Sequence, residues 1–288
     1  MMRVASIGDR VHEGSYRVHS RFAQVVNCSD GRRLVTVVAP GIGMGPIDGP
    51  IKMGPINIVI EGLACTSLHT LRVNRKSVWL DSRRYDCSTA HTYHSGIDLE
   101  PWDPETFGKN LVFFAEQLAI HAPRKSLAFL LDSGRDVHFR GGFEGAFIKH
   151  AGDCVGEIFG GNLLGGIGKL KGCGFGLTPS GDDFIAGLLC GLNVLERAYG
   201  WDLSRSRECV YEAARSGNLL ADVFLGLARD GRVCQATKCL LAALLQAGSG
   251  EIRRSTAELC RMGQTSGADF ATGFLMTLRN GNGALSWS

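Results

Sequence analysis

A short pattern that occurs twice in the second half of the chain constrains the fold more than any other feature. The first copy is Ser180–Leu189 and the second is Ser266–Leu275, and both read S-G-x-D-F-x-x-G-(L/F)-L. In each copy a serine stands three residues before an aspartate, Asp183 or Asp269, and an amphipathic run follows. This is the spacing of a helix capping box. The repeat therefore predicts two helices that begin in the same way and bury the same Phe/Gly/Leu face.

Small residues on that face indicate that the two helices pack against each other. Gly187 and Gly191 are four positions apart in the first copy, and Gly273 occupies the matching position in the second. Because glycine has no side chain, it lets a second backbone approach closely. We expect helices over residues 181–199 and 267–278 to be neighbours, which would bring both capping motifs into one neighbourhood.

A glycine-rich segment leads into the first of these helices: Gly172-Cys-Gly-Phe-Gly-Leu-Thr-Pro-Ser-Gly-Asp-Asp-Phe184. It is neither a Walker loop nor a dinucleotide-binding fingerprint, because the spacing of its glycines and the residues that follow them differ. Helix N-termini carry unpaired amides and a partial positive charge, so two of them suit a small dianion such as phosphate or a dicarboxylate. Asp182 and Asp183 would repel such an anion unless Mg²⁺ or a substrate amide lay between them.

The difference between the two copies singles out Asp182. The capping box accounts for Asp183 and Asp269, whereas Asp182 is replaced by Ala268 in the second copy and is not needed for a cap. We therefore expect Asp182 to be the catalytic candidate. The residues expected to bind the ligand are Gly174, Gly176, Thr178, Ser180, Gly181, Asp182, Asp183, Ser266, Gly267, Asp269 and, from near the N-terminus, His19. The alternative is a buried loop whose polar groups only satisfy one another. It is favoured for the capping pairs alone, and a site is favoured for the whole block.

The order of the remaining patterns predicts an α+β fold. Short β-branched or aromatic runs at 25–26, 34–38, 56–60 and 77–80 read as strands. Asp103-Pro104 then reads as an N-cap followed by the first helical position. Helical patterns follow at 111–120, 126–131, 143–164, 181–199, 204–215, 219–229, 233–246, 251–262 and 267–278. We expect a β-rich, barrel-like domain over residues 1–103 and a helical domain over residues 104–288.

Charge and hydropathy exclude several classes of protein. The chain has 31 basic and 28 acidic residues, and its arginine pairs are short and separate, so no nucleic-acid footprint is present. No apolar run approaches the roughly 18 residues of a membrane span, and the N-terminus does not read as a signal peptide. We expect a cytoplasmic protein with no membrane contact. The cysteines form no C-x-x-C motif, and we expect no metal site and no cofactor, with Mg²⁺ as the one alternative.

The segment Gly176–Asp183, followed by Phe184 and Gly187, resembles the signature of a bacterial family that includes the AllH subunit of oxamate carbamoyltransferase. The later run 265–267 with Asp269 and Gly273, and the early run His19-Ser20-x-Phe22, resemble that family too. The chain departs from the family pattern at two positions of the loop. Phe175 stands where proline is usual, and Cys173 stands where an aliphatic residue is more usual, which puts the detailed shape of the loop in doubt.

The resemblance implies a function. The family enzyme is built from three different subunits and interconverts oxalurate plus phosphate with oxamate plus carbamoyl phosphate. The ligand would be a small carboxylate, carbamoyl or phosphate anion, and the chain would have hetero-oligomeric partners. Amides at the Gly181 helix start would stabilise the developing oxyanion, and Asp182 would orient an NH₂ group.

Two alternatives to a catalytic subunit remain at this point. One is a non-catalytic ligand-binding or scaffolding subunit of a multi-subunit enzyme, and the other is a stand-alone enzyme acting on another small carboxylate or amide. A deep pocket lined by Thr178, Ser180 and Asp182 would favour an enzyme. A large apolar surface around the motif would favour a scaffolding subunit.

Overall fold

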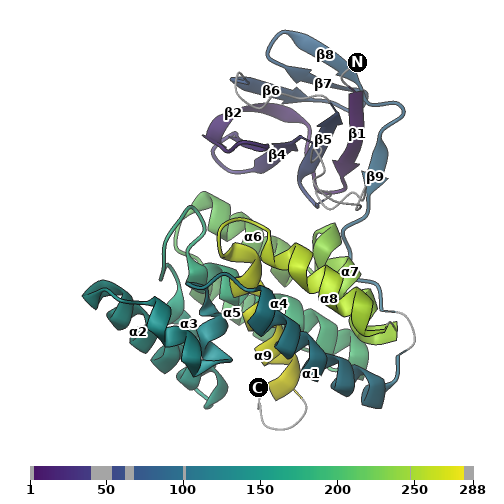
Figure 1. Cartoon of the computed structure of the whole chain (residues 1–288). Helices are drawn as coiled ribbons and strands as arrows, with labels where there is room; N and C mark the ends of the chain where they lie inside the picture. The colour runs from purple at the N-terminus through teal and green to yellow at the C-terminus, as the bar shows by residue number, and fades with distance from the viewer. Residues whose placement is uncertain (1–2, 40–53, 62–67, 100–101, 247, 282–288) are drawn as a thin grey trace. The chain divides into compact units, whose positions relative to one another are not determined.

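The computed structural model describes residues 3–39, 54–61, 68–99, 102–246 and 248–281 (Figure 1). The chain divides into two compact units, one comprising residues 1–96 with 232–235 and the other comprising residues 97–231 and 236–288. Strands make up the first unit and helices the second, so the predicted α+β class is confirmed. Compactness does not test whether each unit folds independently, and the two-domain division at residue 103 stays a prediction.

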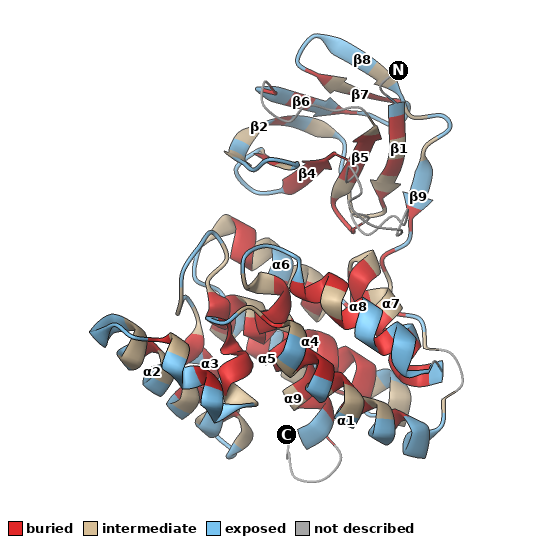
Figure 2. Cartoon of the chain, viewed as in Figure 1, coloured by how far each residue is buried: buried red, intermediate tan, exposed pale blue. Residues whose placement is uncertain are grey.

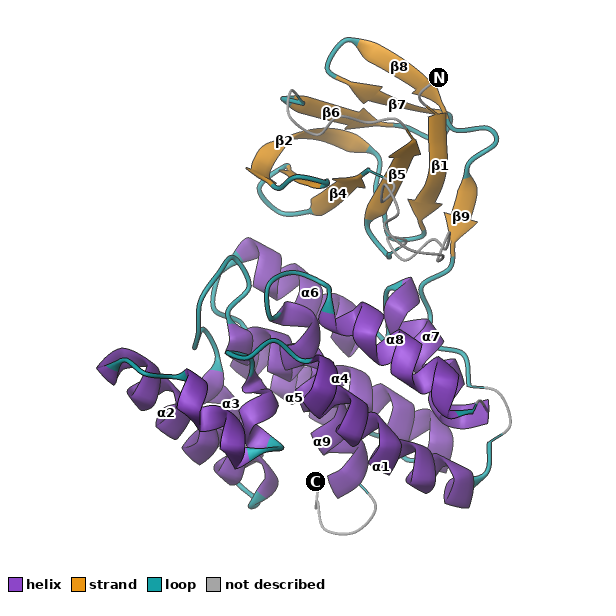
Figure 3. Ribbon diagram, in the orientation of Figure 1, coloured by secondary structure: helices purple, strands orange, loops and turns teal. Residues whose placement is uncertain are grey.

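The strands of the first unit form one nine-stranded sheet in the order β8-β7-β6-β2-β3-β4-β5-β1-β9 (Figure 3). Neighbouring strands run antiparallel except for the parallel pairs β4–β5 and β1–β9. The predicted runs 34–38 and 77–80 are strands with those bounds, and the other two predicted runs overlap strands. The strands are β1 Arg3–Gly8, β2 Gly14–Arg21, β3 Val25–Ser29, β4 Leu34–Val38, β5 Asn57–Glu61, β6 Thr70–Val73, β7 Ser77–Leu80, β8 Arg83–Asp86 and β9 His91–Tyr93.

The sheet curls, as the barrel-like prediction required. Strand β1 pairs with β5 and β9 and also contacts β8, which lies at the far end of the strand order. The curl gathers apolar side chains from many strands into one core, including Tyr16, Val26, Ile58 and Leu71. Within the described residues of this unit no helix covers the sheet, so curling is what removes its apolar face from water.

The second unit is helical from Pro104 onward. Helix α1 begins where the sequence predicts, because Asp103 Oδ2 accepts a hydrogen bond from the Thr106 amide at 2.7 Å and Pro104 occupies the first turn. The helices are α1 Pro104–His121, the short 3₁₀ turns η1 Leu127–Leu130 and η2 Ser133–His138, α2 Gly142–Phe159, α3 Leu163–Leu170, α4 Ser180–Tyr199, α5 Ser204–Ala214, α6 Leu219–Arg229, α7 Gln235–Gln246, α8 Ser249–Cys260 and α9 Ser266–Asn280.

Two of the predicted helices are wrong in detail. The segment predicted as a short helix over 126–131 is a 3₁₀ turn. The segment predicted as one helix over 143–164 is two, because α2 ends at Phe159 and α3 begins at Leu163. Gly161 lies between them with φ of 102°, a left-handed conformation that interrupts the helix and that glycine adopts without strain.

Helix α4 lies at the centre of the unit and is buried along most of its length (Figure 2). It packs on α9, and the two helices touch through glycines. A Cβ on Gly187 would lie 2.0 Å from the Phe270 carbonyl oxygen, and a Cβ on Gly273 would lie 2.0 Å from the Phe184 carbonyl oxygen. The two contacts join the same motif positions, because Gly187 corresponds to Gly273 and Phe184 to Phe270 in the repeated pattern. The predicted neighbourhood of the two motif helices is therefore confirmed.

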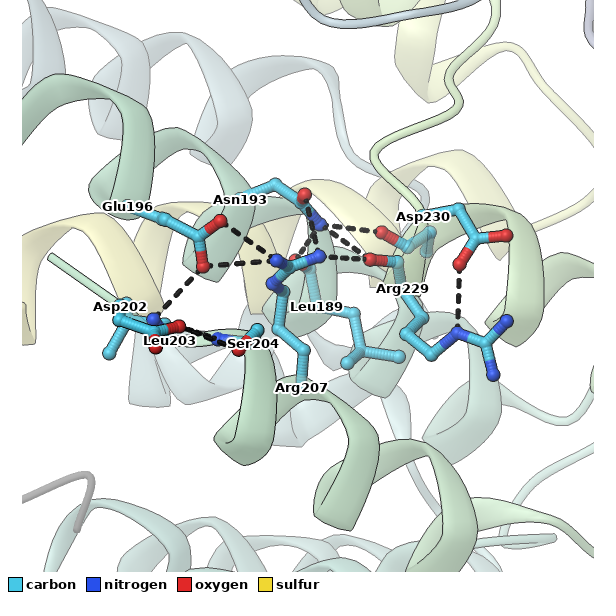
Figure 4. A network of polar contacts seen from close by, with 10 residues as sticks. Leu189, Asn193, Glu196, Asp202, Leu203, Ser204, Arg207, Arg229 and Asp230 are labelled. Atoms are coloured by element: carbon cyan, nitrogen blue, oxygen red, sulfur yellow. Dashed lines mark hydrogen bonds and ion pairs between the residues drawn. The ribbon is translucent and has the colours of Figure 1, made fainter. Parts of the chain in front are cut away.

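A polar network fixes the C-terminal half of α4 against α5 and α6 (Figure 4). The Arg207 guanidinium donates to both carboxylate oxygens of Glu196, at 2.9 and 3.0 Å, and to the Arg229 carbonyl oxygen at 2.6 Å. The Asn193 amide bridges the same groups, since it donates to the Ala228 and Arg229 carbonyls and accepts from Arg207. This network joins the side chains of α4 and α5 to carbonyls at the end of α6, so we assign it a structural role.

Candidate functional site

The two motif helices begin one residue earlier than the capping-box prediction requires. Pro179 is the N-cap of α4, with φ of −58° and ψ of 146°, and Ser180 is already helical. Thr265 is likewise the N-cap of α9, and Ser266 is its first helical residue. The carbonyl of Pro179 accepts from the next amides along α4, so the serine is not needed as a cap. The predicted capping boxes are therefore wrong.

Instead, each motif aspartate faces the serine at the start of the other helix. Asp183 Oδ2 accepts a hydrogen bond from the Thr178 hydroxyl at 3.1 Å, and the Ser266 hydroxyl, 3.2 Å from that of Thr178, also faces this carboxylate. Asp269 is arranged in the same way, facing the hydroxyls of Thr265 and Ser180. Each aspartate thus meets a threonine that precedes its own helix and a serine that begins the other helix. The repeated S-G-x-D spacing is explained by these contacts between the helices.

The carboxylates of Asp183 and Asp269 hold protons more tightly than exposed ones. Burial raises the pKa of Asp269 to about 6, although the Leu127 amide, at 2.6 Å from Oδ1, and the two hydroxyls oppose the shift. Burial also raises the pKa of Asp183 well above its ordinary value, and the nearby charge of Asp269 adds to the increase. Asp269 Oδ2 is buried and has no hydrogen-bond partner among the described residues.

Asp182 has a separate environment from this pair. It is 2% exposed, and its Oδ1 accepts from the Gly172 amide at 2.7 Å, which ties the start of the glycine-rich loop to α4. Its Oδ2 is buried with no hydrogen-bond partner in the described part of the chain. Burial raises the pKa of Asp182, and the Gly172 amide opposes this increase. The structure thus assigns Asp182 an anchoring contact, and its catalytic role stays a prediction.

The glycines of the loop are required by its backbone. Gly172, Gly174 and Gly176 have φ of 70°, 110° and 98°, in the left-handed region that favours glycine. A Cβ on Gly174 would also lie 2.7 Å from the Ser180 amide nitrogen. The Gly181 amide donates to the Cys173 carbonyl at 2.8 Å, so it is not a free donor. In the conformation described, the Gly181 amide therefore cannot bind an oxyanion as the sequence analysis expected.

Gly267 also has a packing explanation. Its Cβ would lie 1.8 Å from the Leu259 carbonyl oxygen, and that of Gly181 would lie 2.1 Å from the Leu170 carbonyl oxygen. Both glycines therefore let the motif helices cross the end of the preceding helix. This contact accounts for the second residue of each S-G pair without any ligand.

An exposed aromatic surface borders the loop. Phe175, in the loop, is 59% exposed and meets Phe143 of α2, which is 72% exposed, at a ring-centroid distance of 5.5 Å. Phe147 lies on the inner side of Phe175, at 6.2 Å. Leu177, two residues further along the loop, is 42% exposed. We call Phe143, Phe175 and Leu177 the aromatic edge.

His19 lies in the other unit, on β2. It occupies a β-bulge, since Val18 pairs with Cys28 and Ser20 with Asn27, which leaves His19 unpaired in the ladder. Together with Ser20 it lines an open hollow of about 620 Å³. The structure thus brings ten of the eleven predicted residues together in the helical unit, 174–183 and 266–269, and places the eleventh in the β unit. The assignment of His19 to the loop site stays a prediction.

Sequence reasoning missed three contributors. Thr265 is one, although its place before the second motif matches that of Thr178 closely enough to have suggested it. The Leu127 and Gly172 amides are the other two. No sequence pattern predicts that a backbone amide of another segment donates to a given carboxylate.

The comparison with protein families gives one match. Residues 170–278 match the family model of oxamate carbamoyltransferase subunit AllH. The matched segment runs from the last residue of α3 to Leu278 in α9, so it contains the loop, both motif copies and the α4–α9 contact. The resemblance stated from the motif is confirmed for this segment. Searches of curated proteins and of solved structures gave no match.

Two searches of the described residues concern membranes and metals. None of their helices combines the length and the apolar character needed to cross a bilayer. Among the same residues, no cluster of three or more His, Cys, Asp or Glu side chains is arranged to hold a metal ion. Whether Mg²⁺ takes part stays open to experiment.

Proposed function

We propose that this chain is a subunit of an oxamate carbamoyltransferase and that Asp182 binds the NH₂ group of the ligand at the loop 171–179. The observation that carries the proposal is the buried Oδ2 of Asp182, which has no donor among the described residues and lies inside the segment that matches the family. An unpaired buried carboxylate oxygen costs free energy. The NH₂ of a carbamoyl or oxamate amide would supply the missing hydrogen bond.

In the proposed reaction, a phosphate oxygen attacks the carbamoyl carbon of oxalurate. The bond from that carbon to the inner nitrogen breaks, the departing nitrogen takes a proton, and the products are carbamoyl phosphate and oxamate. This transfer needs positioning and donors aimed at the developing oxyanion, and no covalent enzyme intermediate. Since the Gly181 amide is occupied, we assign those donors to a partner subunit. Asp182 orients an NH₂ group, which oxalurate, oxamate and carbamoyl phosphate all carry and phosphate lacks.

The decisive variant is Asp182→Asn. The asparagine keeps an oxygen to accept from the Gly172 amide and replaces Oδ2 by a donor, so it removes the proposed ligand contact without removing the loop contact. We expect oxamate and oxalurate to raise the melting midpoint of the wild-type chain and to leave that of the variant unchanged. Ligand at a hundred times its dissociation constant stabilises by about 2.7 kcal/mol, which a melting curve resolves.

Asp153→Asn is the matched control, because Asp153 is an exposed carboxylate on α2 in the same unit. It should respond to both ligands as the wild type does. Equal ligand-induced shifts in all three proteins would contradict the role of Asp182. If no ligand shifts the wild type alone, the titration is repeated with co-purified partner subunits, and a lack of effect there would contradict the site itself.

A second candidate function is a scaffolding subunit that docks a partner without binding substrate. The aromatic edge favours it, because exposed aromatic side chains are typical anchors of protein interfaces. The two candidates differ in what the loop residues do. Under the first, Asp182 controls ligand binding; under the second, Phe175 controls assembly and Asp182 only anchors the loop.

A further inference from the structure

A basic hollow on the β unit is unused by the function proposed above. Its lining consists of Arg17, Val18, His19, Ser20 and Arg21 from β2, with His69 and Thr70 at the start of β6, around a volume of about 620 Å³. Two guanidinium and two imidazole groups therefore border one hollow, all of them on exposed residues. A volume of this size suits a small molecule.

The backbone explains why the hollow forms there. The residue pairs of β2 with β6 end at Arg17, opposite Thr70, whereas those of β2 with β3 reach Arg21. Beyond Arg17 the backbone contact on this side continues through the Val18 amide, which donates to the His69 carbonyl at 3.1 Å just before β6 begins at Thr70. The bulge at His19 falls in the same part of β2, and bulges bend a strand and re-aim its side chains.

Unlike four other arginines of the same unit, Arg17 and Arg21 have no acidic partner among the described residues. Outside the hollow, Arg3, Arg33, Arg75 and Arg232 form ion pairs with Glu61, Asp30, Glu13 and Asp9. Within the described residues, Arg17 has neither an ion pair nor a hydrogen-bond partner, and Arg21 donates only to the Leu68 carbonyl. Each guanidinium carries five N–H groups, so most of these donors are available.

Asp81 contacts the backbone of two lining residues, and its carboxylate is already engaged in hydrogen bonds. Asp81 Oδ1 accepts from the His69 amide at 3.0 Å and from the Thr70 amide at 2.8 Å. Although burial opposes it, these hydrogen bonds lower the pKa of Asp81, so it remains a carboxylate. A further donor is the Ser20 hydroxyl, whose oxygen accepts from Asn27 at 3.0 Å and whose proton is therefore directed elsewhere.

We propose that this hollow binds a small molecule through a phosphate group. Two unpaired arginines call for a dianion, and the five donor side chains exceed what the two oxygens of a carboxylate can accept, whereas a phosphate offers three or four oxygens. Arginine forks match phosphate geometry and bind it with charge-assisted hydrogen bonds. The inference concerns residues 17–21 and 69–70 only, and it holds whether or not the loop of the helical unit binds a ligand.

The test is a titration of the full-length chain with inorganic phosphate. Calorimetry measures the heat of binding, and NMR measures the resonances of the histidine imidazoles. We expect phosphate to shift the imidazole resonances of His19 and His69. We expect Arg17→Gln to weaken the binding about tenfold or more, as the loss of a charge-assisted hydrogen bond implies. Arg17 is the decisive position because its side chain has no hydrogen bond or ion pair to lose among the described residues. The melting midpoint of Arg17→Gln should equal that of the wild type. Arg17→Lys should recover part of the affinity for phosphate.

Arg72→Gln is the matched control. Arg72 is an exposed arginine on β6 outside the hollow, where its guanidinium stacks on the Trp79 ring at 4.1 Å. Phosphate affinity should be unchanged in this variant and in Asp182→Asn, which separates the hollow from the loop. Equal affinity in Arg17→Gln and wild type, or imidazole resonances that do not move, would overturn the proposal. A single-stranded RNA 12-mer that binds more tightly than phosphate and is weakened by Arg72→Gln would also overturn it, in favour of a polyanion surface.

Discussion

The contact between α4 and α9 predicts a large effect for one methyl group. Gly187→Ala would place a Cβ 2.0 Å from the Phe270 carbonyl oxygen, 2.8 Å from the Phe274 amide nitrogen and 2.9 Å from the Phe270 carbonyl carbon. All three atoms belong to the backbone of α9, so no side-chain rotation can relieve the overlap. The two helices must move apart at the point where their buried faces meet.

The expected magnitude follows from two opposing effects. Overpacking of a core typically costs about 1–3 kcal/mol and occasionally more, and a clash with backbone belongs at the upper end. Replacing a helical glycine by alanine returns about 1 kcal/mol of intrinsic helix propensity. We therefore expect Gly187→Ala to reduce the free energy of unfolding by about 2 kcal/mol, which corresponds to a decrease of about 4–8 °C in the melting midpoint.

The assay is urea unfolding followed by the helical circular dichroism signal. Gly156→Ala is the control, since Gly156 lies on the exposed face of α2 and a Cβ there would meet no heavy atom within 4 Å. That variant should be more stable than the wild type by about 0.5–1 kcal/mol. Gly273→Ala, the equivalent change in α9, should behave like Gly187→Ala. If Gly187→Ala is as stable as Gly156→Ala, the close approach of the two helices is refuted.

Two further predictions concern the motif and its surroundings. Burial raises the pKa of Asp269 from its ordinary 3.8 to about 6 in the folded protein, so its favourable contribution to the free energy of unfolding is present below about pH 4 and is lost as the pH rises through 6. Asp269→Asn cannot ionise, so it should gain on the order of 2 kcal/mol relative to the wild type between pH 4 and pH 7, and a pH-independent difference in urea unfolding would contradict this. Phe175→Ser should leave the unfolding free energy within about 0.5 kcal/mol, because the side chain is mostly exposed, but weaken co-purification with partner subunits about tenfold or more. Val112→Ser, at a comparably exposed apolar residue on α1, should not weaken it.

Local patterns predicted the secondary structure of most of the chain. The helix over 219–229 has the predicted bounds, and the Asp103-Pro104 start is observed, because caps and apolar periodicity are local properties. Strand β2 was missed because its residues alternate between exposed and half-buried positions and carry few β-branched side chains. The break between α2 and α3 was missed because the sequence does not show whether a glycine in a helical pattern, such as Gly161, adopts a left-handed conformation.

The candidate site was predictable in its location but not in its contacts. The repeat predicted that α4 and α9 meet, and glycine positions on both helices specified the face. The contact of each aspartate with the serine of the other helix could not be predicted. The spacing of Ser180 and Asp183 in the sequence fits a capping box within one helix equally well. The Pro179 carbonyl decides against the box, because it accepts from the Asp182 and Asp183 amides, so Pro179 is the N-cap and Ser180 is the first helical residue. The basic hollow could not be predicted for a similar reason, since a backbone hydrogen bond from the Val18 amide to the His69 carbonyl brings His69 to β2.

The two copies of the motif differ in one part, and that part is the strongest place to look for function. Both helix starts are built alike, since Gly181 and Gly267 pack on the carbonyl of a preceding helix and both aspartates face the same hydroxyl types. Between α3 and α4, however, residues 171–179 intervene, whereas only 261–265 separate α8 from α9. The longer connection carries the left-handed glycines and is tied down by Asp182, which the second copy replaces with Ala268. A shared scaffold needs neither the longer loop nor its anchor. The symmetric aspartates are therefore explained by contacts between the two helix starts, and the loop with Asp182 is the part that we propose for a ligand or a partner.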